Sequence, residues 1–255
     1  MSADVWPLAG FAFLAGFIDS VAGGGGLIQV PALFVFLPTA PAAMLLGTNK
    51  FSSIWGTSVA AVQYSRAVPI EWRATLPTCL AALVFSFVGA AAVTMIPGEF
   101  LRPLVLVLLG GVLAYTLWRK DLGSIHAPRL KGRVELWAGL GTGAALGFYD
   151  GFFGPGTGSF LVFAFVGLFG YSFLAASASA KLVNVTTNVA ALGWFIASGN
   201  VLYRVAVVLA LFNVAGSYIG SHLAIKRGSA FVRGVFLLVV GALMARYAWD
   251  LWLRH

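Results

Sequence analysis

The sequence predicts an all-helical polytopic membrane protein made of two homologous tandem halves. Three observations predict this fold class. First, 60% of the 255 residues are hydrophobic and only 9% are charged, whereas a soluble domain carries about 25% charged residues. Second, apolar runs of membrane-spanning length follow one another along the whole chain. Third, the second half of the chain repeats the first at an offset of 131 residues.

Charged residues and glycines carry the internal repeat. "GFIDSVAGGG" at 16–25 aligns with "GFYDGFFGPG" at 147–156, which places Asp19 on Asp150. The same register aligns Lys50 with Lys181, Arg73 with Arg204, Gly89 with Gly220 and Trp118 with Trp249. We therefore expect a single transmembrane domain over 1–255, with a first repeat at 5–118, a linker at 119–135 and a second repeat at 136–252. Tandem halves of this kind are typical of transporters.

Each predicted repeat contains four apolar units. They span 5–37, 41–64, 74–96 and 100–118 in the first repeat, and 136–168, 172–198, 203–225 and 230–252 in the second. Most have the ~20 residues that cross a ~30 Å hydrocarbon core, but 5–37 and 136–168 are too long for one crossing and too short for two. Because glycine relieves backbone restrictions, "AGGGG" at 22–26 and "GPGTG" at 154–158 are predicted to break these two units into half-helices.

The geometry of the broken units decides the symmetry of the repeats. Re-entrant hairpins leave three full crossings in each half and give inverted repeats, whereas broken crossings leave four and give parallel repeats. The linker holds five Lys and Arg residues within 119–133, and basic loops mark the cytoplasmic side. The N-terminus reads as retained and carries no basic residue, and "KRGSAFVR" at 226–233 would be cytoplasmic in the inverted arrangement. These two observations favour inverted repeats.

Two lysines lie inside apolar units at equivalent positions of the repeats. Lys50 lies in "LLGTNKFSSIWGTS" and Lys181 lies in "ASASAKLVNVTTN". A lysine at the centre of a membrane helix costs roughly 2.5–3.5 kcal/mol, so a matched pair indicates a shared interior location. Neighbouring polar residues can donate hydrogen bonds to an anion or join helices. The predicted binding residues on these two segments are Lys50, Lys181, Thr48, Asn49, Ser52, Asn184 and Asn188.

The glycine breaks add a second set of hydrogen-bond donors. A half-helix that begins after each break presents unsatisfied N–H groups and a positive dipole end, and successive free amides form an anion-binding nest. The candidate residues are Gly24, Gly25, Gly26, Gly156, Thr157 and Gly158. Together with the two lysines, they predict a site for a small oxyanion near the middle of the membrane.

The two aspartates that precede the breaks have several possible roles. Asp19 and Asp150 could hold the lysines while the site is empty, or carry protons during transport. They could also cap the broken helices. An ion pair between an aspartate and a lysine would give both residues a purely structural role. The sequence leaves these alternatives open.

Several other classes of function are disfavoured. The basic residues gather in the linker, which points to membrane topology rather than to nucleic acid, and the single cysteine, Cys79, has no neighbouring ligand for a metal or cofactor. An intramembrane protease would use Ser159 and His222, but nothing in the sequence would orient the histidine. We therefore expect a non-enzymatic protein with a small anion and the lipid bilayer as partners, and homo-oligomers stay open.

The paired motifs resemble those of the sulfite exporter TauE/SafE family of membrane permeases. The resemblance covers essentially the whole chain and depends on "GFIDSVAGGGGLIQVPAL" (16–33), "LGTNKFSSIWGTS" (46–58), "GFYDGFFGPGTGSF" (147–160) and "SASAKLVNVTTN" (177–188). It implies a multi-pass permease of the bacterial inner membrane for small anions, often sulfur oxyanions or organosulfonates that are exported. The leading hypothesis is a secondary transporter with alternating access. An anion channel, or a permease for another small anion or carboxylate, is the alternative.

Overall fold

The computed structural model describes residues 5–97, 99–101, 104, 107 and 127–252, and these residues form helices and loops without a β-strand. In the first half the helices are α1 (Val5–Ala22), α2 (Gly26–Phe36), α3 (Ala42–Ala67) and α4 (Trp72–Thr94). In the second half they are α6 (Gly132–Phe152), α7 (Thr157–Gly167), α8 (Phe173–Ala197) and α9 (Tyr203–Trp252). Most of the predicted unit 100–118, residues 119–126 of the linker and Trp118 lie outside the described residues.

The helices break where the glycine runs predict. α1 ends at Ala22 and α2 begins at Gly26, while α6 ends at Phe152 and α7 begins at Thr157. The backbone turns at glycines with positive φ, namely 74° at Gly23, 94° at Gly154 and 86° at Gly156. Other residues rarely adopt this conformation, so the prediction of glycine-broken first units is confirmed.

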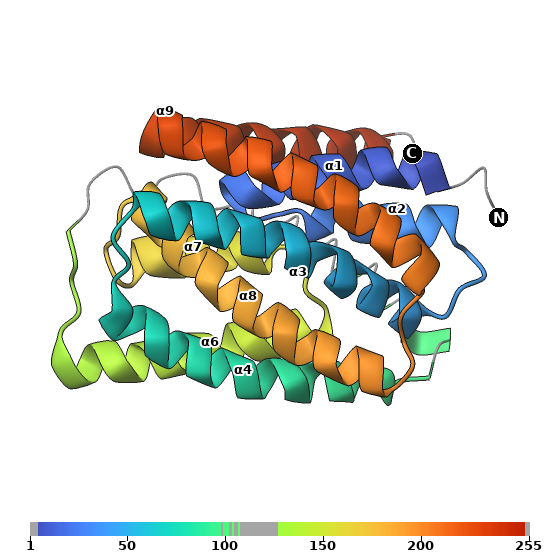
Figure 1. Ribbon diagram of the computed structural model, residues 1–255, viewed down its shortest axis with the longest axis horizontal. Helices are drawn as coiled ribbons and strands as arrows, with labels where there is room; N and C mark the ends of the chain where they lie inside the picture. The colour runs from blue at the N-terminus through green and yellow to red at the C-terminus, as the bar shows by residue number, and fades with distance from the viewer. Residues whose placement is uncertain (1–4, 98, 102–103, 105–106, 108–126, 253–255) are drawn as a thin grey trace.

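Each broken unit folds back on itself as a hairpin. Leu33 near the end of α2 packs with Leu8 and Ala12 near the start of α1. In the second half, the rings of Tyr149 on α6 and Phe160 on α7 have centroids 5.6 Å apart. In Figure 1 the two hairpins enter the molecule from opposite ends. Their glycine tips lie against each other, because a Cβ at Gly23 would lie close to the backbone of Gly158.

The helices form two bundles, and each bundle contains one helix from the other half of the sequence. α1 packs along α9 and α6 packs along α4. We define the first bundle as α1, α2, α3 and the Tyr203–Gly228 part of α9, and the second bundle as α6, α7, α8 and α4. Close approach at glycines permits this packing, because a Cβ at Gly147 would lie 2.6 Å from Cα of Ala82 and a Cβ at Gly16 would overlap the carbonyl of Asn213. α4 and α9 therefore pack mainly on helices from the opposite half of the sequence.

Helices that the sequence repeat equates run in opposite directions. Thr75 and Thr94 of α4 bond to Ser179 and Trp194 of α8, so these two helices run parallel. α3 runs antiparallel to α8, because Gly47 near the start of α3 lies beside Phe195 near the end of α8. The colour gradients in Figure 1 follow the same directions.

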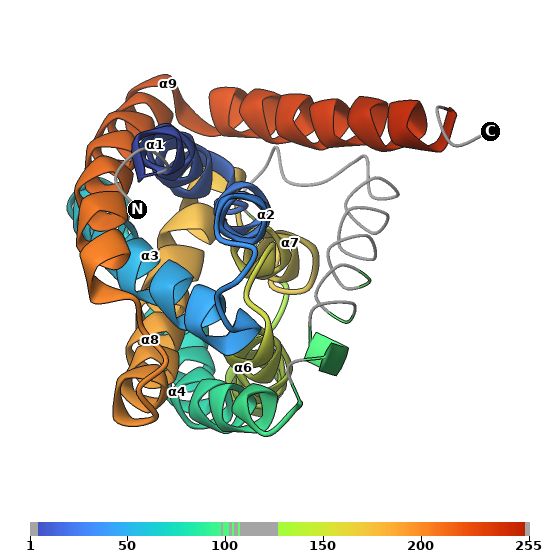
Figure 2. The same cartoon turned by 90° about the vertical axis from the view of Figure 1, so that its right-hand side faces the viewer.

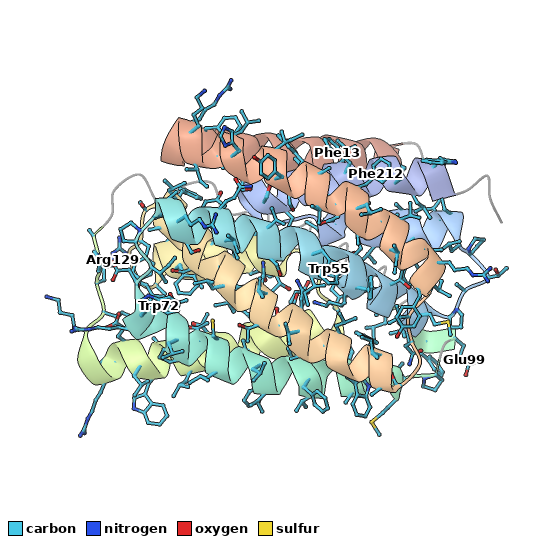
Figure 3. The ribbon with its side chains drawn as sticks, in the orientation of Figure 1. Phe13, Trp55, Trp72, Glu99, Arg129 and Phe212 are labelled. Carbon is cyan, nitrogen blue, oxygen red and sulfur yellow. The ribbon has the colours of Figure 1, made fainter. Side chains whose placement is uncertain are left out.

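The outer surface suits a lipid environment. Two helices in the described part of the chain, Trp72–Thr94 and Tyr203–Gly228, are long and apolar enough to cross a membrane. Large apolar side chains of α4 are exposed in a continuous set that comprises Leu76, Leu80, Leu83, Val84, Phe85, Phe87 and Val88. Soluble proteins rarely expose apolar surface on this scale, and exposed Trp6, Trp72 and Trp137 lie near helix starts. Figure 3 shows Trp72 and Arg129 at one end of the molecule and Glu99 at the other.

Three helices differ from simple apolar spans. α3 and α8 have 26 and 25 residues, but they do not reach the hydropathy of a membrane span, because they carry the buried polar residues of the interior.

The predicted unit 203–225 extends to Gly228, where φ is 72° and the α9 helix changes direction. Beyond Gly228 the helix leaves the bundle, as Figure 2 shows.

Candidate functional site

Two ion pairs connect the bundles. Nζ of Lys50 on α3 lies 2.5 Å from Oδ2 of Asp150 on α6. Nζ of Lys181 on α8 lies 2.9 Å from Oδ2 of Asp19 on α1, and it also donates to the main-chain carbonyl of Asp19. Each lysine therefore pairs with the aspartate of the other sequence half.

The helix breaks place both carboxylates at the hairpin tips. Asp19 lies in the last turn of α1 and Asp150 lies in the last turn of α6. The N–H of Gly25 donates to Oδ1 of Asp19 over 3.4 Å, so this carboxylate contacts the amide just ahead of α2. The capping role that the sequence leaves open for Asp19 thus has a geometric basis, and the same carboxylate binds Lys181.

A polar cavity lies between the bundles around these groups. Its empty volume is about 360 Å³, including the space at its mouth. Nine of the sequence-predicted site residues line it, namely Asp19, Gly26, Asn49, Lys50, Asp150, Gly156, Gly158, Asn184 and Asn188. The structure therefore brings together residues from the lysine segments and from both glycine breaks.

The remaining predicted residues lie near the cavity without lining it: Thr48, Ser52, Lys181, Gly24, Gly25 and Thr157. Lys181 is buried and reaches the cavity through its partner Asp19. Oγ1 of Thr48 donates to the carbonyl of Met44 and accepts from the N–H of Leu202, which holds the loop before α9. Oγ1 of Thr157 donates to the carbonyl of Gly154 and so stabilises the turn before α7.

Three lining residues are absent from the predicted binding residues, although Ser53 flanks Lys50 and Gly154 belongs to the predicted break. They are Ser53, Thr57 and Gly154. Ser53 and Thr57 follow Asn49 at intervals of four residues on α3, and residues four apart share one helical face. This spacing was the signal that could have identified Ser53 and Thr57 as lining residues.

The hairpin tips touch each other beside the cavity. Oγ of Ser159 donates to the carbonyls of Ala22 and Gly23 across the two hairpins. A Cβ at Gly23 would lie 2.8 Å from Cα of Gly158. Ser159 thus has a structural role at the tips, while the side chain of His222 is exposed.

The comparisons with known proteins decide the family. The chain matches the sulfite exporter TauE/SafE family over residues 8–247. It belongs to the sulfite exporter TauE/SafE family. The resemblance that the motifs carry is therefore confirmed.

The relatives of this TauE/SafE family member are named as probable membrane transporters. One is the probable membrane transporter protein ORF9 of Sinorhizobium sp., which is 35% identical over 96% of this chain and 94% of its own length. YfcA of Escherichia coli K12 is 34% identical over 94% of this chain and 87% of its own length. A Haemophilus influenzae protein is 32% identical over 93% and 92%. No solved structure matches the chain. The protein therefore has a membrane transport role.

The two ion pairs differ in their surroundings. The side chain of Asp150 is 6% exposed, whereas that of Asp19 is 20% exposed. In the described part of the chain, Lys50 supplies the hydrogen bond to the Asp150 carboxylate, while Asp19 has Lys181 and the N–H of Gly25. The two pairs occupy equivalent positions in the sequence repeat. Their carboxylates differ in exposure to solvent and in the number of hydrogen bonds that they accept.

In this TauE/SafE family member, the four charged groups of the two ion pairs balance one another. Two ammonium and two carboxylate groups give the four residues no net charge, and buried charges need such pairing. Oδ1 of Asn49 is buried without a hydrogen-bond partner in the described residues.

Proposed function

We propose that the protein is a secondary transporter that exports small anionic sulfur compounds, such as sulfite or organosulfonates, by alternating access. The observation that carries this proposal is the pair of buried lysines, each held by a carboxylate across one polar cavity. A cation carrier would require unpaired negative charge at this position, whereas each of the two carboxylates that line the cavity is paired with an ammonium group.

Recognition of the anion combines a charge with directional donors. The ammonium of Lys50 supplies the charge, and the amides of Asn184 and Asn188 supply orientation from α8. The starts of α2 and α7 add the positive ends of two helix dipoles, because Gly26 of α2 and Gly158 of α7 line the same cavity. Charge-assisted hydrogen bonds of this type are stronger than neutral ones.

Inverted repeats support alternating access. α2 and α7 begin 131 residues apart, as do α4 and α9, which is the offset of the sequence repeat. Matched helices run in opposite directions, and the site lies between two bundles of corresponding composition. Rocking of one bundle against the other would open the cavity to each side in turn, with the two ion pairs breaking and re-forming between them.

The proposed location is the bacterial inner membrane, crossed several times. Arg129 and the α3–α4 loop lie at the end that the basic linker marks as cytoplasmic, since Leu130 packs with Val68 and Ile70 in one cluster. The α2–α3 and α8–α9 loops lie at the opposite end, where the N–H of Leu202 bonds to Thr48.

Calorimetry in detergent tests the proposed site. Sulfite and methanesulfonate are titrated into the wild type and into Lys50→Ala and Lys181→Ala, with Lys226→Ala as the control because Lys226 is an exposed lysine outside the cavity. Binding should weaken at least tenfold in both cavity variants and stay unchanged in the control. Undiminished affinity in both cavity variants would reject the site. Saturable flux with counterflow in proteoliposomes separates a carrier from a channel.

A further inference from the structure

We propose that Asp150, and not Asp19, carries one proton with each transported anion. This inference rests on the proposed anion transport and names the coupling residue of the same site. The sequence repeat equates the two aspartates, so the distinction comes from their surroundings in the folded protein.

Loss of its lysine affects the two carboxylates differently. In the described residues the Asp150 carboxylate is bound by Lys50, and its side chain is only 6% exposed. When an anion takes over Lys50, Asp150 stays buried without a counter-charge. An isolated buried carboxylate is so costly that it takes up a proton instead.

Asp19 has other means of staying charged. Its carboxylate keeps the N–H of Gly25 at the break before α2, and 20% of its side chain is exposed. A carboxylate that accepts a backbone N–H and contacts water is stabilised in its ionised form. Asp19 therefore keeps a hydrogen-bond donor and contact with solvent when its lysine binds another group.

The other groups that face Asp150 do not replace Lys50. α3 contributes Lys50 itself, and α8 contributes the neutral amides of Asn184 and Asn188 to the same cavity. α1 contributes a second carboxylate, Asp19, and α7 contributes only the start of its helix at Gly158. Tyr149, next to Asp150 on α6, uses its hydroxyl to donate to the carbonyl of Pro155. α4 places Ser86 against α6 at Gly151, and the Ser86 hydroxyl donates to the carbonyl of Thr187.

The step balances in charge and atoms. A proton from water adds to a carboxylate oxygen of Asp150, while the ammonium of Lys50 stays protonated and binds the anion. With a monoanion bound, the positive charges of Lys50 and Lys181 balance the negative charges of Asp19 and the substrate. The site therefore remains neutral. On the other side the anion and the proton leave together and the Lys50–Asp150 pair re-forms. The membrane potential does not drive this neutral cycle, and export requires an anion gradient that exceeds the opposing pH gradient.

Proteoliposomes with a clamped potential test the assignment. Methanesulfonate is the probe because it stays ionised near neutral pH and carries no proton itself; its flux is followed together with internal pH. The wild type should move one proton with each anion. Asp150→Asn should move the anion without protons and respond to the membrane potential, whereas the anion flux that Asp19→Asn retains should still be coupled to protons.

A binding measurement keeps the proposal testable if Asp150→Asn folds poorly. In detergent, one linked proton makes wild-type affinity for methanesulfonate rise by up to about tenfold for each unit of falling pH. Wild-type anion flux without proton movement, pH-independent wild-type binding, or proton-coupled flux in Asp150→Asn would overturn the role of Asp150. Absence of both sulfite and methanesulfonate flux in the wild type would instead overturn the proposed function, and this inference with it.

Discussion

The ammonium of Lys50 lies 2.5 Å from the carboxylate of Asp150, although 100 residues separate them in the chain. The pair joins α3 of the first bundle to α6 of the second at the edge of the polar cavity. Its repeat-related counterpart joins Lys181 to Asp19. Both pairs join the two bundles beside the cavity, so substrate binding and bundle motion would act on the same groups.

Removal of one partner of the Lys50–Asp150 pair should destabilise the protein strongly. Lys50→Met leaves a buried carboxylate without a counter-charge, which costs about 3–5 kcal/mol. The double variant Lys50→Met with Asp150→Leu removes both charges and should recover most of the loss. Unfolding in detergent micelles measures all three proteins, and a double variant less stable than either single variant would contradict the buried-pair interpretation.

Lys181→Met should cost less than Lys50→Met. Asp19 is the more exposed carboxylate and keeps its hydrogen bond to Gly25 when the lysine is absent. The same unfolding measurement ranks the stability of the two variants. A larger loss of stability for Lys181→Met would show that exposure of the carboxylate does not control the cost of removing its lysine.

Gly23→Ala should disrupt the contact between the hairpin tips and destabilise the protein. Gly24→Ala should leave the stability almost unchanged. Gly23 has φ 74°, and a Cβ there would lie 2.7 Å from N of Ser159. The strained backbone alone costs about 1–3 kcal/mol. A Cβ at Gly24 would make ordinary contacts, with Ser159 Oγ at 3.6 Å. Thermal unfolding and anion flux compare the neighbours, and equal behaviour of the two variants would argue against the observed tip contact.

The sequence predicts the helix breaks better than the partners of the lysines. Runs of glycine interrupt a helix whatever surrounds them, so the breaks at 22–26 and 154–158 could be placed from the chain alone. The choice of Asp150 rather than Asp19 as the partner of Lys50 depends on which helices face each other. Helical periodicity defines a face but not the element opposite it. For the same reason, the exchange of α4 and α9 between the bundles was not predicted.

A charge on the exposed face of α4 should prevent membrane insertion. Val84 is 58% exposed near the middle of this apolar helix. Val84→Lys adds roughly 2.5–3.5 kcal/mol to insertion, whereas Val84→Leu should insert normally. Resistance to alkaline extraction from membranes measures insertion. Equal extraction of the two variants would show that this face does not contact lipid.

The two ends of the molecule should be accessible from opposite sides of the membrane. With Cys79 replaced by alanine, single cysteines are introduced at the exposed residues Thr39, Ser198, Ala67 and Arg129. Thr39→Cys and Ser198→Cys should react with an impermeant thiol reagent added to whole cells, because the other two positions lie at the cytoplasmic end. Labelling of Thr39→Cys and Arg129→Cys from the same side would exclude the proposed topology.

A structure with a bound heavy-atom sulfonate tests the central claim most directly. In crystals grown with 2-bromoethanesulfonate, the anomalous bromine peak and the sulfonate density should lie in the cavity beside Lys50, with the sulfonate oxygens within hydrogen-bond distance of its Nζ and the Asp150 carboxylate displaced. A sulfonate bound outside this cavity, with both lysine–aspartate pairs intact, would contradict the account.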